Sequence, residues 1–163
     1  MLILGIDPGL HITGYGLVSL TARGGGQPLL QEAGVLRMKP KGDLATRLRE
    51  LHQQLTELIE EMSPDRMAVE QLYAHYKHPR TAILMGHARG VILLAAAAAE
   101  IPVTNMPSTL VKRTITGNGH ASKIQVQRSI ANLCHLDTPP EPPDVADAIA
   151  IAWSLATRIR TTP

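Results

Sequence analysis

Residues 1–9 of the chain read MLILGIDPG, in which the apolar run Met1–Ile6 is followed directly by Asp7, Pro8 and Gly9. An unbroken apolar run bounded by turn residues is typical of a buried β-strand. The run has no basic leader and no small-residue cleavage site, so it does not resemble a secretion signal. Proline presets φ at the first turn position and glycine accepts a positive φ at the second, as a type II turn requires. We therefore predict a buried strand that ends at an acidic residue and a tight turn.

The rest of the chain continues with further apolar runs and with amphipathic patterns. Between Leu44 and Leu58 apolar residues recur at helical spacing after Asp43, a suitable N-cap, and Ser63-Pro64 ends the pattern. The predicted strands are Met1–Ile6, Tyr15–Leu20, Leu29–Leu36, Arg66–Val69 and Val103–Met106. The predicted helices are Leu44–Met62, Thr81–Ala99, Ser108–Ile115, a helix opened by the capping box Ser122–Gln125 that ends near His135, and a last helix with its buried stripe between Val145 and Ile159. The segment Asp137–Pro143 contains four prolines and is predicted to be a loop.

The order of these elements predicts an α/β fold. The first three strands are joined by short connections, which favours an antiparallel meander, and the later strands alternate with helices, as in crossover units. A chain of 163 residues with 44% hydrophobic residues is sufficient for one core. We expect a single domain over residues 1–163.

Composition limits the class of protein without identifying it. The formal net charge of +2 is a weak argument for a nucleic-acid partner. The longest unbroken apolar run, Val91–Ala99, is about half of the roughly 20 residues needed to cross a bilayer, so we expect no membrane partner. A single cysteine, Cys134, excludes a disulfide within the chain and is consistent with the cytoplasm.

Four acidic residues stand where acids are unusual. Asp7 and Glu70 each end an apolar strand, and parallel neighbouring strands would bring both carboxylates to one edge of the sheet. Asp144 and Asp147 are three residues apart at the start of the last helix, so they share a face. Each acid alone also has an ordinary structural explanation, as a turn residue, an ion-pair partner, an N-cap or a first-turn acid.

Four carboxylates in one place would need cations to balance their charge. Two divalent ions supply that charge, and all-oxygen ligand sets suit Mg²⁺, with Mn²⁺ as a substitute. A pair of such ions stabilises the attacking and leaving oxygens when a phosphodiester is hydrolysed. The acids therefore predict a metal-dependent phosphodiesterase with Asp7, Glu70, Asp144 and Asp147 as ligands and catalytic residues.

Four motifs in order resemble the RuvC-type Holliday junction resolvases of the RNase H-like superfamily. The motifs are Gly5-Ile6-Asp7-Pro8-Gly9 with Thr13-Gly14-Tyr15-Gly16, Val69-Glu70-Gln71 followed by Tyr73, Gly86-His87-Ala88-Arg89-Gly90-Val91, and Asp144-Val145-Ala146-Asp147-Ala148-Ile149-Ala150. The resemblance covers nearly the whole chain. It implies an RNase H-like fold with a five-stranded mixed sheet, in which three antiparallel strands and two parallel strands are flanked by helices.

The resemblance also implies an activity and partners. It implies a homodimer that makes symmetric nicks in two strands of a four-way DNA junction during recombination and repair, with two metal ions at the four acids of each subunit. A branch-migration helicase is implied as a further partner. Lys112 and Lys123 match basic positions near the scissile phosphate, and a solvent-exposed helix face is the alternative for both.

The segment after Glu70 suggests DNA contacts. Tyr73 matches a position where the family usually has an aromatic wedge, often Phe, and a buried core tyrosine is the alternative. Lys77 and Arg80 follow in a segment that combines aromatic and basic side chains, as do proteins that bind single-stranded nucleic acid. The expected DNA-binding residues are thus Tyr73, Lys77, Arg80, Lys112 and Lys123.

Other interpretations remain open at this point. A junction-binding module with an inactive site would share most of these features, and a nuclease acting on RNA–DNA hybrids would use the same acids. An actin-like ATP-binding domain would share only the Asp-Pro-Gly turn. The helix Thr81–Ala99 predicts the dimer interface because Gly86, Ala88 and Gly90 permit close contact and Ile83, Leu84, Val91 and Leu94 need cover. A central helix buried within one subunit is the alternative for that segment.

Overall fold

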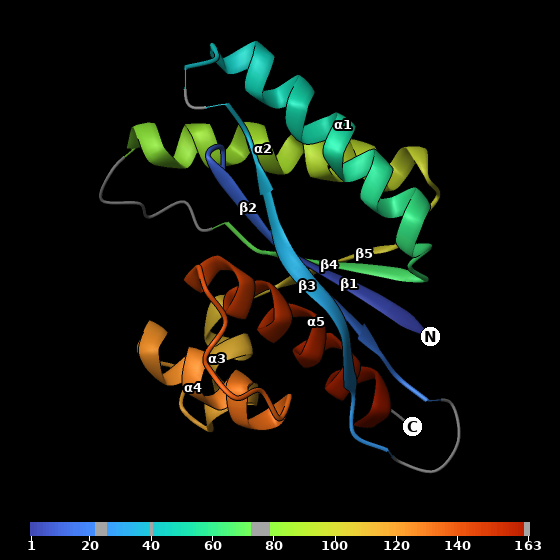
Figure 1. The fold of residues 1–163 in the computed structure, drawn as a ribbon, viewed down its shortest axis with the longest axis vertical. Helices are drawn as coiled ribbons and strands as arrows, with labels where there is room; N and C mark the ends of the chain where they lie inside the picture. The colour runs from blue at the N-terminus through green and yellow to red at the C-terminus, as the bar shows by residue number, and fades with distance from the viewer. Residues whose placement is uncertain (22–25, 40, 73–78, 162–163) are drawn as a thin grey trace.

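A five-stranded mixed sheet forms the centre of the molecule in the computed structural model, which describes residues 1–21, 26–39, 41–72 and 79–161 (Figure 1). The strand order is β3-β2-β1-β4-β5. The pairs β1–β2 and β2–β3 are antiparallel, whereas β1–β4 and β4–β5 are parallel. The strands are β1 (Leu2–Asp7), β2 (Ile12–Ser19), β3 (Leu29–Arg37), β4 (Arg66–Glu70) and β5 (Val103–Met106). The predicted meander and parallel pair are confirmed.

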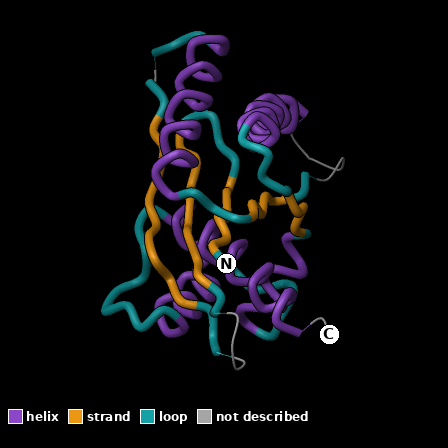
Figure 2. Tube along the Cα trace, turned by 90° about the vertical axis from the view of Figure 1, so that its right-hand side faces the viewer, coloured by secondary structure: helices purple, strands orange, loops and turns teal. Residues whose placement is uncertain are grey.

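Helices cover both faces of the sheet. In Figure 1, α1 and α2 lie above the sheet and α3, α4 and α5 lie below it, and the side view of Figure 2 shows the same separation. The helices are α1 (Leu44–Met62), α2 (Pro79–Ala98), α3 (Ser108–Thr116), α4 (Lys123–Leu133) and α5 (Pro143–Thr161). The sheet is therefore the middle layer between two hydrophobic cores.

The alternation of side chains along β1 builds these two cores. Ile3 belongs to the cluster with α3, α4 and α5, whereas Leu4 and Ile6 belong to the cluster with α1 and α2. Successive strand residues point to opposite faces, so residues 3, 5 and 7 share the α5 face. At Gly5 an added Cβ would lie 2.3 Å from the carbonyl oxygen of Ala148. Helix α5 therefore packs closely against β1, and Asp7 points toward this helix.

The N-terminal caps of α1 and α4 are the ones predicted from the sequence. The Asp43 side chain accepts a hydrogen bond from the Thr46 backbone N–H at 2.7 Å, which confirms the predicted N-cap. The predicted capping box at the start of α4 is also present, between Ser122 and Gln125. Strand β2 begins at Ile12, earlier than the predicted Tyr15, because it pairs with β1 as far as Asp7↔Gly14 and with β3 as far as Ile12↔Arg37.

Helix α2 is apolar, yet only a small part of it is buried. By length and composition alone, Arg80–Ala98 is sufficient to cross a membrane, and only 22% of that window is buried inside the protein. Its buried residues, Ala88, Ile92, Ala95 and Ala96, belong to the same core as α1. The exposed side chains include Ile83 at 62% and Leu94 at 60%.

Candidate metal-dependent nuclease site

Asp7 and Glu70 occupy equivalent positions on neighbouring parallel strands. Asp7 is the last residue of β1, Glu70 is the last residue of β4, and the two strands pair through Ile6↔Val69. On β4, Ala68 faces the α5 core, so Glu70, two residues later, has the same orientation. Both carboxylates therefore lie at one edge and on one face of the sheet.

The backbone of β2 brings α5 to the same place. Gly14 is the register partner of Asp7, and a Cβ added at Gly14 would lie 2.1 Å from the carbonyl oxygen of Asp144. Only a glycine permits this approach. Asp144 stands in the first turn of α5, and Asp147 follows on the same face.

The turn after Asp7 differs from the predicted one. Among the described glycines only Gly117 has a positive φ, so Gly9 is not in the type II turn conformation that the sequence suggested. Glycine is required there for another reason, because a Cβ at Gly9 would lie 2.1 Å from the carbonyl oxygen of Ile12. The buried Thr13 hydroxyl donates to the Gly9 carbonyl at 2.7 Å and accepts from the Gly9 N–H at 3.2 Å. This exchange fixes the chain next to Asp7.

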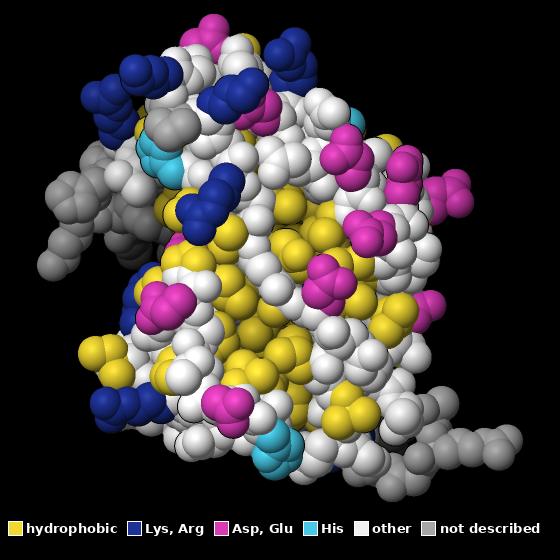
Figure 3. All heavy atoms as spheres, viewed as in Figure 1, with side chains coloured by type: hydrophobic (Ala, Val, Ile, Leu, Met, Phe, Trp, Pro, Cys, Tyr) yellow, Lys and Arg dark blue, Asp and Glu magenta, His cyan; other side chains and the backbone are white. Residues whose placement is uncertain are grey.

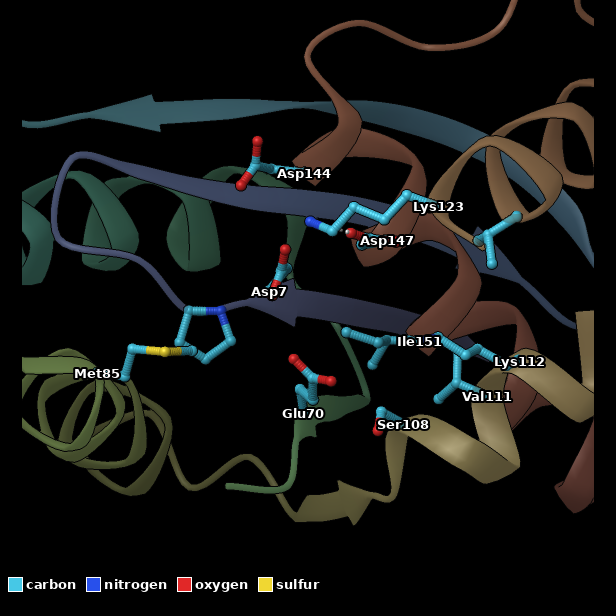
Figure 4. A pocket seen from close by; sticks show the side chains of 12 residues that line it. Asp7, Glu70, Met85, Ser108, Val111, Lys112, Lys123, Asp144, Asp147 and Ile151 are labelled. Atoms are coloured by element: carbon cyan, nitrogen blue, oxygen red, sulfur yellow. Dashed lines mark ion pairs between the residues drawn. The ribbon is translucent and has the colours of Figure 1, made fainter. Parts of the chain in front are cut away.

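The four acids line a single pocket of about 320 Å³. Figure 4 shows Asp7 and Glu70 directed inward from the two strand ends, with Asp144 and Asp147 supplied by α5. Two cations, Lys112 on α3 and Lys123 on α4, also line the pocket. The other lining residues are Pro8, Met85, Ser108, Val111, Val126 and Ile151.

Burial and repulsion between neighbouring charges raise the pKa of the carboxyls of Asp7, Glu70 and Asp147. Burial, followed by the charges of Glu70, Asp147 and Asp144, raises the pKa of Asp7 well above its ordinary value. Burial and then Asp147 raise the pKa of Glu70, while Lys123 and Lys112 oppose that change. Burial also raises the pKa of Asp147, and its ion pair with Lys123 offsets part of the rise. The pocket therefore carries uncompensated negative charge when its acids ionise.

Lys123 provides the nearest positive charge. Its Nζ lies 3.4 Å from Oδ2 of Asp147, and the dashed line in Figure 4 marks this pair. Burial lowers the pKa of Lys123, but Asp147, Asp7 and Asp144 together outweigh burial and raise it. Lys123 thus remains an ammonium ion that partly balances the acids.

The chemistry of the donor set suits a divalent cation. Four carboxylates that line one pocket provide the oxygen ligands that Mg²⁺ and Mn²⁺ prefer. Among the described residues, however, no group of three or more His, Cys, Asp or Glu side chains is arranged to hold a metal ion as it stands. Carboxylates that repel one another spread apart, so we expect these ligands to close around a cation when it binds.

The other predicted site residues have different outcomes. Tyr73 and Lys77 lie outside the described residues. Arg80 lies exposed at the start of α2 and does not line the pocket. Arg89 was quoted only as part of the motif Gly86–Val91 and was given no role, whereas in the structure its Nε donates to the carbonyl oxygen of Glu70 at 3.2 Å. The motif marks the position, but no spacing or charge pattern predicts this bond, because its acceptor is the backbone of a residue 19 positions away.

Known proteins resemble the chain over nearly its whole length. The family model described as crossover junction endodeoxyribonuclease RuvC matches residues 3–154. The protein of that name from Rhodopirellula baltica is 52% identical over 150 residues, which cover 92% of this chain and 83% of that protein. The one from Thermosipho melanesiensis is 41% identical over 160 residues, which cover 98% and 99% of the two chains.

A solved structure extends the similarity to three dimensions. The structure of T. thermophilus RuvC in complex with Holliday junction substrate has a TM-score of 0.88 and 31% identity, and the match covers 98% of this chain and 95% of that one. The yeast mitochondrial Holliday junction resolvase Ydc2, at 12% identity and a TM-score of 0.67, shares the fold. These matches leave no support for the actin-like interpretation. The chain belongs to the crossover junction endodeoxyribonuclease RuvC family.

Proposed function

We propose that this single-domain protein is an endonuclease that resolves Holliday junctions by symmetric hydrolysis of phosphodiesters in two DNA strands, during recombination and repair. One observation carries the proposal: in a member of the RuvC family, carboxylates from β1, β4 and α5 line one pocket together with two lysines. A relative with this fold was solved in complex with a Holliday junction.

Asp7, Glu70, Asp144 and Asp147 would hold the divalent metal, and we propose two Mg²⁺ ions per subunit with Mn²⁺ as a substitute. When bound, the ions would stabilise charge on the attacking and leaving oxygens of the phosphodiester. The carboxylates contribute the negative charge that binds the cations, and their burial limits competition from water. The rigid ends of β1 and β4 keep two of the four ligands in fixed positions.

The positive charges near the acids would receive the DNA. Lys112 and Lys123 line the same pocket and would face the negative phosphate from α3 and α4. We propose Arg80, Tyr73 and Lys77 as further DNA contacts. On the face shown in Figure 3, Lys and Arg side chains gather at the upper left and Asp and Glu side chains on the right. On this face, therefore, basic and acidic side chains lie apart in spite of the small net charge, and a basic region suits a polyanionic substrate.

We propose that two copies pair through α2. Ile83, Gly86, Gly90 and Leu94 repeat every three or four residues and are all exposed, so they form one stripe along the helix. An added Cβ at Gly86 or Gly90 would meet nothing within 4 Å, which leaves room for a second helix. Ala88, predicted to lie in the interface, is instead buried in the core of its own subunit. Two pockets on one dimer would account for paired nicks.

The remaining partners follow from family membership. We propose a branch-migration helicase as the assembly that delivers junctions to this protein, and the cytoplasm as its location.

A nick-mapping assay tests the proposed function. The purified protein is incubated with an end-labelled four-way junction or with a matched linear duplex, in Mg²⁺ or in EDTA. We expect nicks at symmetric positions in two strands of the junction, in Mg²⁺ only. The duplex should remain intact, because it lacks the branch point.

Two results would contradict the proposal. Junction binding without nicks at any Mg²⁺ or Mn²⁺ concentration would identify a binding module with an inactive site. Cleavage of an RNA–DNA hybrid in preference to the junction would identify a nuclease with a different substrate.

A further inference from the structure

Arg89 connects three elements beside Glu70. From α2, its Nε donates to the carbonyl oxygen of Glu70 at 3.2 Å, and its Nη2 donates to Oδ1 of Asn105 on β5. The side chain of Arg89 is half-buried. One guanidinium thus joins α2 to the ends of β4 and β5.

Glu70 needs such a connection because the sheet holds it from one side only. On the β5 side, Glu70 pairs with Met106, and the N–H of Gln71 donates to the Met106 carbonyl at 2.9 Å. On the β1 side, pairing ends one residue earlier, at Ile6↔Val69. A backbone carbonyl at a partly buried strand end requires a donor, and Arg89 supplies it.

We propose that Arg89 is a positioning residue for Glu70, a step that rests on the proposed function. The guanidinium is planar and always charged, so it holds two acceptors in a fixed relation. By fixing the Glu70 carbonyl against Asn105, Arg89 fixes the backbone torsion angles of Glu70 and hence the direction of its carboxylate into the pocket. A lysine has a single ammonium on a flexible stem and would not hold both acceptors in that way.

The test compares Arg89→Met with a matched variant, Arg47→Met. On α1, the Nε of Arg47 donates to the carbonyl of Gly42 at 2.9 Å, which is the same type of bond at a residue that does not line the pocket. Mn²⁺ binding is measured by calorimetric titration of the DNA-free protein, so that no readout depends on cleavage. Folding is checked by circular dichroism.

We expect Arg89→Met to weaken Mn²⁺ binding by about 10- to 100-fold, the usual effect of removing a residue that orients a metal ligand. Arg47→Met should bind Mn²⁺ like the wild type, even if its melting temperature falls. Arg89→Lys should give an intermediate loss. Junction binding in EDTA should stay within about twofold, because the lysines of the pocket are unchanged.

Asn105→Ala keeps the inference testable if Arg89→Met does not fold. It removes one anchor of the guanidinium and should weaken Mn²⁺ binding less than Arg89→Lys. Unchanged Mn²⁺ affinity in both Arg89→Lys and Asn105→Ala would overturn the inference and leave Arg89 a structural residue. Mn²⁺ binding that is unaffected by Glu70→Gln would instead refute the proposed metal site, and this inference with it.

Discussion

Asp7 is a carboxylic acid that the fold stabilises in its protonated form. Burial and three neighbouring acids raise its pKa, so the ionised group is less stable in the folded state than in the unfolded chain. As the pH rises through the ordinary carboxyl range, unfolded chains release this proton first, and folding stability falls. Without metal, the ionised Asp7, which the proposed reaction needs, destabilises the folded protein at neutral pH.

Asp7→Asn should therefore increase stability while it abolishes cleavage. In EDTA at neutral pH we expect a higher melting temperature than for the wild type, because the amide carries no charge to bury. In Mg²⁺ the wild type should gain stability and the variant should gain much less. Calorimetry and the nick-mapping assay measure both effects, with Asp137→Asn at an exposed loop position as the control. A melting temperature below that of the wild type in EDTA would contradict the prediction.

Cys134 should react slowly and should limit stability at high pH. Burial raises the pKa of its thiol from 9.0 to about 11. Unfolded chains lose this proton first, so the contribution of the thiol to folding stability declines as the pH rises from 9.0 toward about 11. At pH 8 we expect alkylation by iodoacetamide to be about 100-fold slower than in denaturant, since only the thiolate reacts. Mass spectrometry follows the reaction, and equal rates in both conditions would show that the thiol is accessible and ionised.

The site residues that could be predicted from the sequence are those that interrupt a regular apolar pattern. Asp7 and Glu70 were predicted to meet because each ends an apolar strand, and parallel pairing places strand ends together. The turn at Gly9 was predicted wrongly, because turn statistics explain a glycine by a positive φ, whereas at this position the Ile12 carbonyl leaves no room for a Cβ. Arg89 was quoted within a family motif, but its contacts could not be predicted, because its acceptors become neighbours only when α2 packs beside β4 and β5.

At the scale of elements, the position of α5 decides the geometry of the pocket. The helix carries two of the four acids and crosses β1 and β2 where glycines leave no side chain in the way. The sequence predicted the helix and the glycine-containing strands separately. It did not predict that Gly14 and Asp144 touch, because that contact depends on the angle at which the helix crosses the sheet.

Gly14→Ala should push the start of α5 away from β2. The added methyl group would lie 2.1 Å from the Asp144 carbonyl, so the helix must shift. We expect a loss of about 1–3 kcal/mol in the free energy of unfolding, as is usual for an overpacked core, and weaker Mn²⁺ binding. Urea denaturation and metal titration measure the two effects. Gly42→Ala, whose nearest contact would be a Thr46 methyl group at 3.3 Å, is the control and should change neither.

At the scale of the whole molecule, the outer stripe of α2 is the surface that a second copy would cover. Ile83 and Leu94 are eleven positions apart, about three helical turns, so they lie on the same side of the helix. Covering the stripe would also remove from water the apolar surface that makes Arg80–Ala98 resemble a membrane span.

Replacing both Ile83 and Leu94 with Glu should separate the dimer. Light scattering should give about twice 17.6 kDa for the wild type and 17.6 kDa for the double variant. Mn²⁺ affinity should be unchanged, because neither residue lines the pocket. A wild type of 17.6 kDa would disprove the proposed dimer, and co-sedimentation of that monomer with lipid vesicles would identify a membrane surface as the partner of α2.

The distribution of the four acids along the chain also governs when the protein becomes active during its synthesis. Asp7 and Glu70 leave the ribosome long before Asp144 and Asp147, which belong to the last helix. A chain still being translated lacks half of the acids and has no α5 to close the pocket. Prematurely terminated products that end before α5 should therefore be harmless to the chromosome, even where β1 and β4 have already paired.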